Sequence, residues 1–211
     1  MERMKKLIAI AMILITCVFS FSGCIRTSEV GDTVKFGTYK GDDIEWIVLA
    51  KDGNKTLLIS KYVIEARAYN DTKGDVKWED STLMEWMNDD FYFEAFGVLE
   101  KARITNTPLY EKEDGSTLSN RVFLLDSDEI VKYLPEKKDR TTRFTMYVLN
   151  NGYDYGTNID GSCSFWLRPS DPDYQGTYLV GTNGTIHESQ KSYGFRPEDQ
   201  IGVRPAIWVE F

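Results

Sequence analysis

The chain has 211 residues, a length that suits one domain with a short additional segment. Its hydrophobic content of 42% is ordinary for a globular protein and argues against disorder as the default state. The formal net charge is −8, and residues 1–23 contribute +2 to it, so the rest of the chain carries −10. An acidic chain lacks the basic face that releases phosphate counterions, so no nucleic-acid partner is expected.

The first 23 residues have the features of a secretory signal peptide. Met1–Lys6 is positively charged, and Leu7–Phe21 is an apolar run too short to span a membrane comfortably. Phe21-Ser22-Gly23-Cys24 then resembles the lipobox of bacterial lipoproteins. The resemblance implies that Cys24 is lipidated and anchors the protein to the extracytoplasmic face of a bacterial membrane. The alternative is an ordinary secretory signal in which Cys24 is incidental.

The domain itself is expected over residues 33–211, after a tether at residues 24–32. Its first part predicts strands. Val34–Gly37 has a strand pattern, and residues 44–60 alternate and then become continuously apolar around the turn Asp52-Gly53-Asn54. This pattern predicts a β-hairpin.

A helix is predicted over Asp80–Asn88, where Thr82 and Glu85 have capping-box spacing. A second helical turn is expected over Phe91–Phe96. The aromatic residues of this region fall on one helical face and are expected in the core rather than in a ligand cage: Trp86, Phe91 and Phe96.

Two more strands are predicted at Arg103–Thr105 and Arg121–Leu125, on either side of a turn region at Lys112–Ser116. A short helix is predicted over Asp128–Leu134. Ser127 is its expected N-cap, since a hydroxyl there can accept from the first free N–H groups.

From residue 141 to residue 200 the composition shifts to Tyr, Asn, Asp, Gly and Ser. Residues 177–188 predict a hairpin, because Asn183-Gly184 favours the turn that matches strand twist. The chain is expected to end in a strand over Gly202–Phe211, with Pro205 placing it at an edge or a bulge.

Several motifs, in this order and spacing, resemble an uncharacterised bacterial domain that is often found in exported proteins. They are Ile44–Leu49, Leu57–Ser60, Trp78-x-x-Ser81-x-Leu83-x-x-Trp86-x-Asn88, Val122–Leu125, Trp166-Leu167-Arg168 and Gly202-Val203-Arg204-Pro205-Ala206. The resemblance implies an α+β, C-type-lectin-like fold with a small twisted antiparallel sheet, two main helices and a long loop region. It implies no particular activity.

Residues for catalysis or metal binding are sparse. Cys163 and His187 could form a thiol catalyst, but nothing local would lower the pKa of the thiol, so a buried inert cysteine is expected. One histidine and one body cysteine do not suit zinc. Calcium could use the oxygen ligands of the loop, although turn formation explains them more simply: Asn158, Asp160, Asp171 and Asp173. No cofactor is expected.

The tyrosine-rich loop is the best candidate for a binding surface, because Tyr and Trp among small polar residues are typical of such surfaces. The candidate ligand-binding residues are Tyr153, Tyr155, Asn158, Trp166, Arg168, Tyr174 and Tyr193. The competing interpretation is that these tyrosines fill the core, and that Arg168 and Arg204 hold loops to the sheet.

The sequence therefore favours a non-enzymatic recognition module for an envelope protein or glycan. A cell-envelope hydrolase or transferase with acidic catalytic residues is one alternative. A purely structural accessory domain is another.

Overall fold

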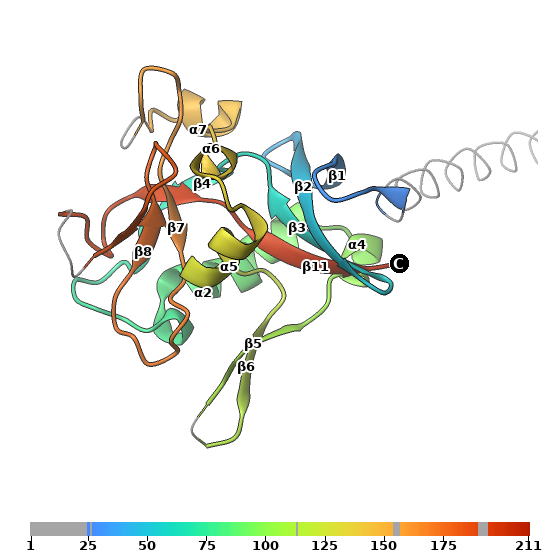
Figure 1. The fold of residues 1–211 in the computed structure, drawn as a ribbon, viewed down its shortest axis with the longest axis horizontal. Coiled ribbons are helices and arrows are strands. Elements are labelled where there is room, and N and C mark those ends of the chain that lie inside the picture. The colour runs from blue at the N-terminus through green and yellow to red at the C-terminus, as the bar shows by residue number, and fades with distance from the viewer. Residues whose placement is uncertain (1–24, 26, 113, 154–156, 190–193) are drawn as a thin grey trace, which may run out of the picture.

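The computed structural model describes residues 25, 27–112, 114–153, 157–189 and 194–211. The fold is α+β (Figure 1), and within these residues the strands form sheets of four, five and two strands. The predicted signal peptide and Cys24 lie outside the described residues. The residues that follow lie against the domain, since the side chain of Ile25 is buried and the amide of Gly31 donates to the Val48 carbonyl.

The four-stranded sheet is antiparallel and joins the beginning of the domain to its end. Its order is β1 (Thr33–Tyr39), β2 (Asp42–Asp52), β3 (Lys55–Ser60) and β11 (Ala206–Glu210). The predicted hairpin over residues 44–60 is confirmed as β2 and β3, with Asp52 paired with Lys55. The predicted strand at Val34–Gly37 is confirmed within β1.

The five-stranded sheet gathers short strands from distant parts of the chain. Its order is β4 (Glu65–Arg67), β10 (Ile201–Val203), β7 (Phe165–Leu167), β8 (Tyr178–Val180) and β9 (Ile186–Glu188). The predicted hairpin around Asn183-Gly184 is confirmed by the pairing of β8 with β9. The expectation of a purely antiparallel sheet is wrong at one place, because β10 and β7 are parallel.

The single strand predicted over Gly202–Phe211 is two strands in two sheets, β10 and β11. Pro205 lies in the break between them. A proline has no backbone N–H for a strand ladder, which explains why the pairing changes at this point. The chain thereby crosses from the five-stranded sheet to the four-stranded one and connects them.

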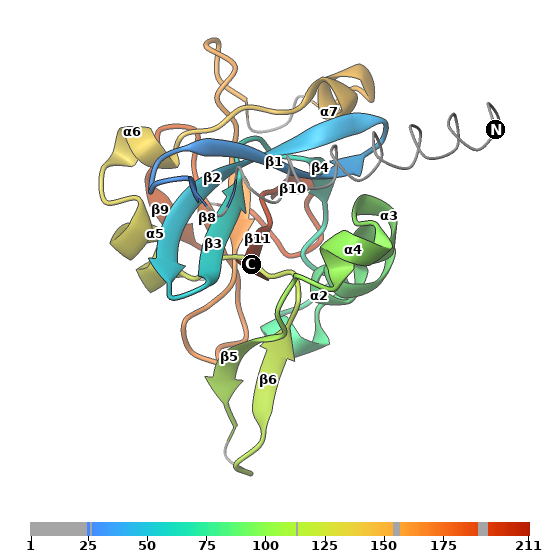
Figure 2. The ribbon, with the colours of Figure 1, turned by 90° about the vertical axis from the view of Figure 1, so that its right-hand side faces the viewer.

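The two-stranded sheet consists of β5 (Thr107–Glu111) and β6 (Thr117–Asn120), which project from the body of the domain (Figures 1 and 2). The strands predicted at Arg103–Thr105 and Arg121–Leu125 are wrong in position. Each segment makes one isolated bridge to β11 instead. Val122–Leu125 is continuously apolar because it runs through the core, buried on all sides, and not because it belongs to a ladder.

Short helices surround the sheets. They are η1 (Trp78–Asp80), α2 (Thr82–Trp86), η2 (Met87–Phe91), α3 (Tyr92–Ala95), α4 (Val98–Lys101), α5 (Ser127–Tyr133), α6 (Lys137–Arg140) and α7 (Met146–Asn150). The first expected main helix is a continuous helical segment, α2–η2–α3, with a π-helical turn in its middle. The second is α5. The expectation of two main helices omits α4, α6 and α7.

Both predicted N-caps are wrong by one residue. Ser81, not Thr82, caps α2 and accepts from the Met84 amide. Asp126, not Ser127, caps α5. Each cap lies beside a second polar residue of similar capping ability, so local propensity alone does not choose between them.

Two adjoining clusters of buried side chains make the core. The predicted core residues Trp86, Phe91 and Phe96 are buried in the first cluster, so their core assignment is confirmed. Cys163 and Phe165 belong to the second cluster, which lies between the two larger sheets and α5.

Gly202 in β10 is a point where two backbones come close, which generates a prediction. A methyl group at this position would lie 2.5 Å from the Ser164 carbonyl oxygen and 2.9 Å from the Val63 side chain. Gly202→Ala should therefore lower the free energy of unfolding by about 1–3 kcal/mol. The control is Gly97→Ala, where the nearest atom would be at 3.5 Å. Equal urea midpoints for the two variants would contradict this packing.

Candidate functional site

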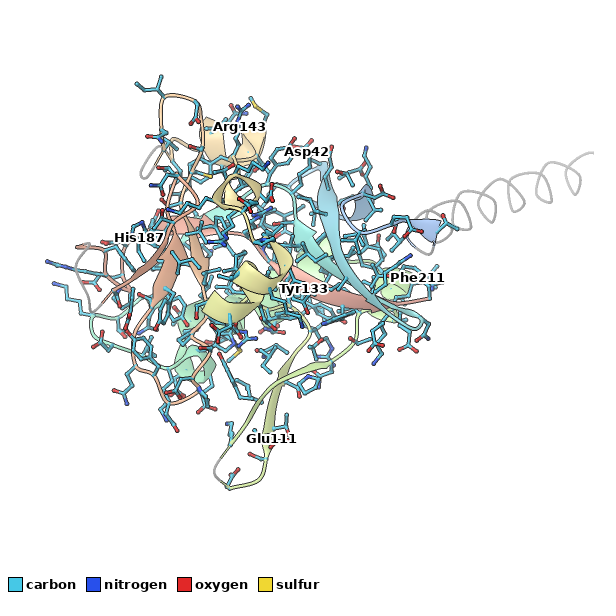
Figure 3. All side chains as sticks on the ribbon, viewed as in Figure 1. Asp42, Glu111, Tyr133, Arg143, His187 and Phe211 are labelled. Atoms are coloured by element: carbon cyan, nitrogen blue, oxygen red, sulfur yellow. The ribbon has the colours of Figure 1, made fainter. Side chains whose placement is uncertain are left out.

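A cleft with a volume of about 280 Å³ lies along the outer half of the β5–β6 hairpin, next to its turn. Three segments form its walls. The first is Lys77–Glu79 at η1, the second is the hairpin itself, and the third is the loop after β7, at Pro172 and Asp173. Glu111, labelled in Figure 3, extends from the projecting hairpin.

Two ion pairs connect the walls of this cleft. Lys77 Nζ lies 2.6 Å from Asp173 Oδ1 and joins η1 to the loop. Lys112 pairs with Glu79 and joins the hairpin to η1. The hydrogen bond to Asp173 raises the pKa of the Lys77 ammonium, and the one to Glu79 raises that of Lys112. The rim of the cleft therefore presents both signs of charge in fixed places.

The inner side of the cleft is formed by Tyr110, which is buried. Its hydroxyl donates to the Pro169 carbonyl, and its ring lies 4.8 Å from the Arg168 guanidinium carbon. Burial raises the pKa of the Tyr110 hydroxyl to about 12, so it remains a hydrogen-bond donor at neutral pH.

Arg168 lies behind Tyr110 and is only 2% exposed. Its Nη2 is 2.8 Å from Glu129 Oε2 and 3.1 Å from Asp126 Oδ2. Burial raises the pKa of the Glu129 carboxyl, and the Arg168 charge opposes that shift. Arg168 thus holds the loop after β7 to the start of α5 through carboxylates, as in the structural interpretation of the sequence.

Arg204 has the corresponding role between the sheets. Its Nε donates to the Ser60 carbonyl at 2.8 Å, and its Nη1 donates to the Arg140 carbonyl at 3.4 Å. Burial lowers the pKa of the guanidinium to about 10, which still leaves it charged at neutral pH. Arg168 and Arg204 therefore both stabilise the interior of the domain.

The other predicted ligand-binding residues are dispersed. Trp166 is fully buried, with its indole N–H donating to the Arg67 carbonyl at 2.9 Å. Tyr174 is half-buried and donates to Glu188 Oε1 at 2.7 Å. Tyr153 is half-buried against the core, and Asn158 is exposed in a turn. Tyr155 and Tyr193 lie outside the described residues. None of the described candidates lines the cleft.

Of the residues that line the cleft, sequence reasoning singles out Asp173 alone, as a possible calcium ligand. It places Lys112 and Asp114 only in a turn region and assigns no role to Lys77. Their charges are ordinary for exposed segments. The proximity of Lys77 to Asp173, 96 positions apart, has no signal in a single sequence.

A family model described as a domain of unknown function, DUF6273, matches residues 53–211. The chain belongs to this family. The match includes all three walls of the cleft, whereas β1 and β2 precede it although they complete the first sheet. No match was found among curated proteins or among solved structures.

Within the described part of the DUF6273 chain, no helix combines the length and apolarity needed to cross a bilayer. The described residues also hold no group of three or more His, Cys, Asp or Glu side chains placed to bind a metal ion. The loop carboxylates have other roles: Asp160 accepts from the amide and hydroxyl of Ser162, and Asp173 pairs with Lys77.

Cys163 is a free, buried cysteine, as expected. Its thiol lies 3.6 Å from the Thr142 carbonyl oxygen, and burial raises its pKa from 9.0 to about 12. His187, which a thiol catalyst would need as its base, lies on β9 (Figure 3), and burial lowers its pKa.

A first prediction for the DUF6273 domain concerns this thiol. Since the folded pKa is raised, burial stabilises the fold while the thiol is protonated, and this contribution is lost as pH rises from 9.0 towards about 12. Unfolding measured across this range should show the loss in the wild type and a smaller loss in Cys163→Ala. The native thiol should react slowly with a maleimide and rapidly after denaturation. Rapid native labelling would contradict this burial.

A second prediction compares two buried tyrosines. The Tyr69 hydroxyl has no hydrogen-bond partner among the described residues, whereas the Tyr110 hydroxyl donates to Pro169. Tyr69→Phe should be neutral or stabilising by about 1 kcal/mol, because an unpaired buried polar group is removed. Tyr110→Phe should cost about 1 kcal/mol. The reverse order in thermal melts would show that the hydrogen bonding at Tyr69 is different.

Proposed function

We propose that this DUF6273 protein is a non-enzymatic recognition module, lipid-anchored through Cys24 on the extracytoplasmic face of a bacterial membrane. Its ligand is an extended segment of an envelope protein, bound in the cleft along the β5–β6 hairpin. The observation that carries this proposal is the three-walled cleft, whose charged rim is fixed by ion pairs and whose inner side rests on Tyr110 and Arg168.

A polypeptide suits the cleft for two reasons. In the described part of the chain β5 and β6 pair only with each other, so each has an outer edge that can receive a further strand. The rim also carries both signs of charge, from Lys77 and Lys112 and from Glu79, Glu111 and Asp173, which complements a polar segment of mixed charge.

A glycan is the other ligand class that the sequence favours. Sugar rings are commonly bound on open aromatic faces. Among the described residues that line this cleft, Tyr110 is the one aromatic residue, and it is buried with Arg168 against its ring. The aromatic residues of the loop are half-buried or buried where they are described, which gives a glycan little to stack on.

The proposal includes a C-type-lectin-like fold. Two features support it. The first and last strands, β1 and β11, belong to the same sheet, and the long segment between β6 and β11 carries four strands of the second sheet and only short helices. The non-enzymatic assignment is supported by the carboxylates behind the cleft, since Asp126 and Glu129 are occupied by Arg168 and by backbone amides.

The test uses a photoreactive phenylalanine analogue in place of Glu111, incorporated in cells that produce the full chain. We expect a discrete protein adduct after irradiation. Asp173→Ala, which removes one wall's charge, should reduce the adduct about tenfold if that contact is central to binding. The matched control is Asp43→Ala, because Asp43 belongs to an exposed ion pair with Lys35 on β1–β2.

Three results separate the alternatives. An adduct lost with Asp173→Ala but retained with Asp43→Ala supports polypeptide recognition in the cleft. An adduct that is insensitive to both, or no adduct, contradicts it. Retention of the purified protein on cell-wall sacculi, lost only with Asp173→Ala, would instead identify a glycan ligand.

A further inference from the structure

A second surface of the domain lies at the corner where α3 ends and α4 begins. Three large apolar side chains are exposed there within seven residues: Phe93 at 62%, Val98 at 84% and Leu99 at 63%. Most large apolar side chains of the described residues are hidden. An apolar group left exposed in this way marks a contact surface.

We infer that this corner rests in the headgroup region of the bilayer, with Phe93, Val98 and Leu99 inserted as a shallow apolar anchor. The inference rests on the lipid anchor of the proposed function. It adds the face of the domain that meets the membrane, and it does not involve the cleft.

The place where the described chain begins supports a bilayer as the occupant. The side chain of Ile25 is 1% exposed and belongs to the same core cluster as Phe96, at the end of α3. Consecutive Cα atoms are about 3.8 Å apart, so a lipid on Cys24 would hold Ile25 within a few ångströms of the headgroups. In Figure 1 the start of the described chain (blue) lies on the same side of the domain as α4.

The charges around the corner are also compatible with a membrane interface. Glu94 pairs with Lys40 at 2.9 Å, and the Glu100 carboxylate accepts from two backbone amides. Lys101 donates to the Phe93 carbonyl at 3.1 Å and lies 4.7 Å from the centre of the Phe93 ring. The free-energy cost of bringing a charge close to an apolar phase is smaller when the charge already has a partner. The aliphatic stem of a lysine can also extend its ammonium towards the headgroups.

A second copy of the chain is a less suitable occupant. One aromatic side chain buries about 150–250 Å². Three side chains therefore cover only a few hundred Å², whereas a standard stable interface needs about 800 Å² from each partner. A bilayer has no such requirement when a covalent lipid already holds the protein at its surface.

The test places an environment-sensitive fluorophore at this corner of the full lipidated chain, through Leu99→Cys in a Cys163→Ala background. The protein is reconstituted into vesicles of phosphatidylethanolamine and phosphatidylglycerol, with or without nitroxide-labelled lipid. The matched control is Val131→Cys on α5, another exposed apolar position at 45%. Intact-mass measurement of the same sample, with Cys24→Ser as reference, reports whether the lipid is attached.

We expect the label at position 99 to shift its emission to shorter wavelength and to be quenched by the nitroxide lipid, and the label at position 131 to do neither. Adding Phe93→Ser and Val98→Ser should reduce both the emission shift and the quenching, while the lipid keeps the protein on the vesicles.

Equal spectra at the two positions on lipidated protein would contradict the insertion of this corner into the membrane but would be consistent with the lipid anchor. In the absence of vesicles, a shift to shorter wavelength that grows with protein concentration would contradict membrane insertion and would indicate self-association through this corner. A mature chain without lipid would overturn both the anchor and this inference, while the crosslinking result at the cleft would be unaffected.

Discussion

The buried guanidinium of Arg168 is the interaction on which the arrangement of the cleft depends. It joins three segments that are far apart in sequence: the end of β7, the start of α5 through Asp126 and Glu129, and β5 through the ring of Tyr110. A buried charge is costly unless its partners stay in place, so loss of any one of these contacts disfavours the whole arrangement. This coupling holds the hairpin and the loop after β7 at a fixed separation, and the space between them is the cleft.

The closing motif Gly202-Val203-Arg204-Pro205-Ala206 has a related physical basis. Gly202 allows β10 to approach Ser164, and Arg204 satisfies backbone carbonyls of Ser60 and Arg140 inside the domain. Pro205 then ends one ladder so that Ala206 can begin the next. The two larger sheets are therefore joined by a short segment in which Gly202, Arg204 and Pro205 each have a separate role.

Local signals were sufficient for part of this fold. The hairpin over residues 44–60 could be predicted because its turn residues and alternation act within a few positions, and the burial of Cys163 followed from its apolar neighbours. The strand at Val122–Leu125 could not, because a continuously apolar run looks the same in a ladder and in a core crossing. The cleft could not be predicted either. Tyrosine content does not distinguish exposed rings from buried ones, and the pairing of Lys77 with Asp173 depends on the complete topology.

Amide hydrogen exchange of Arg168→Lys tests most directly whether this guanidinium organises the site. Lysine keeps the positive charge but lacks the planar fork that reaches Asp126 and Glu129 and covers the Tyr110 ring. Exchange should accelerate in residues 107–120, in the loop at 169–173 and at the start of α5, while the protection of β1, β2 and β3 stays close to that of the wild type. Unchanged exchange at the hairpin and loop, or an equal increase throughout the chain, would contradict the claim that Arg168 holds the walls of the cleft together.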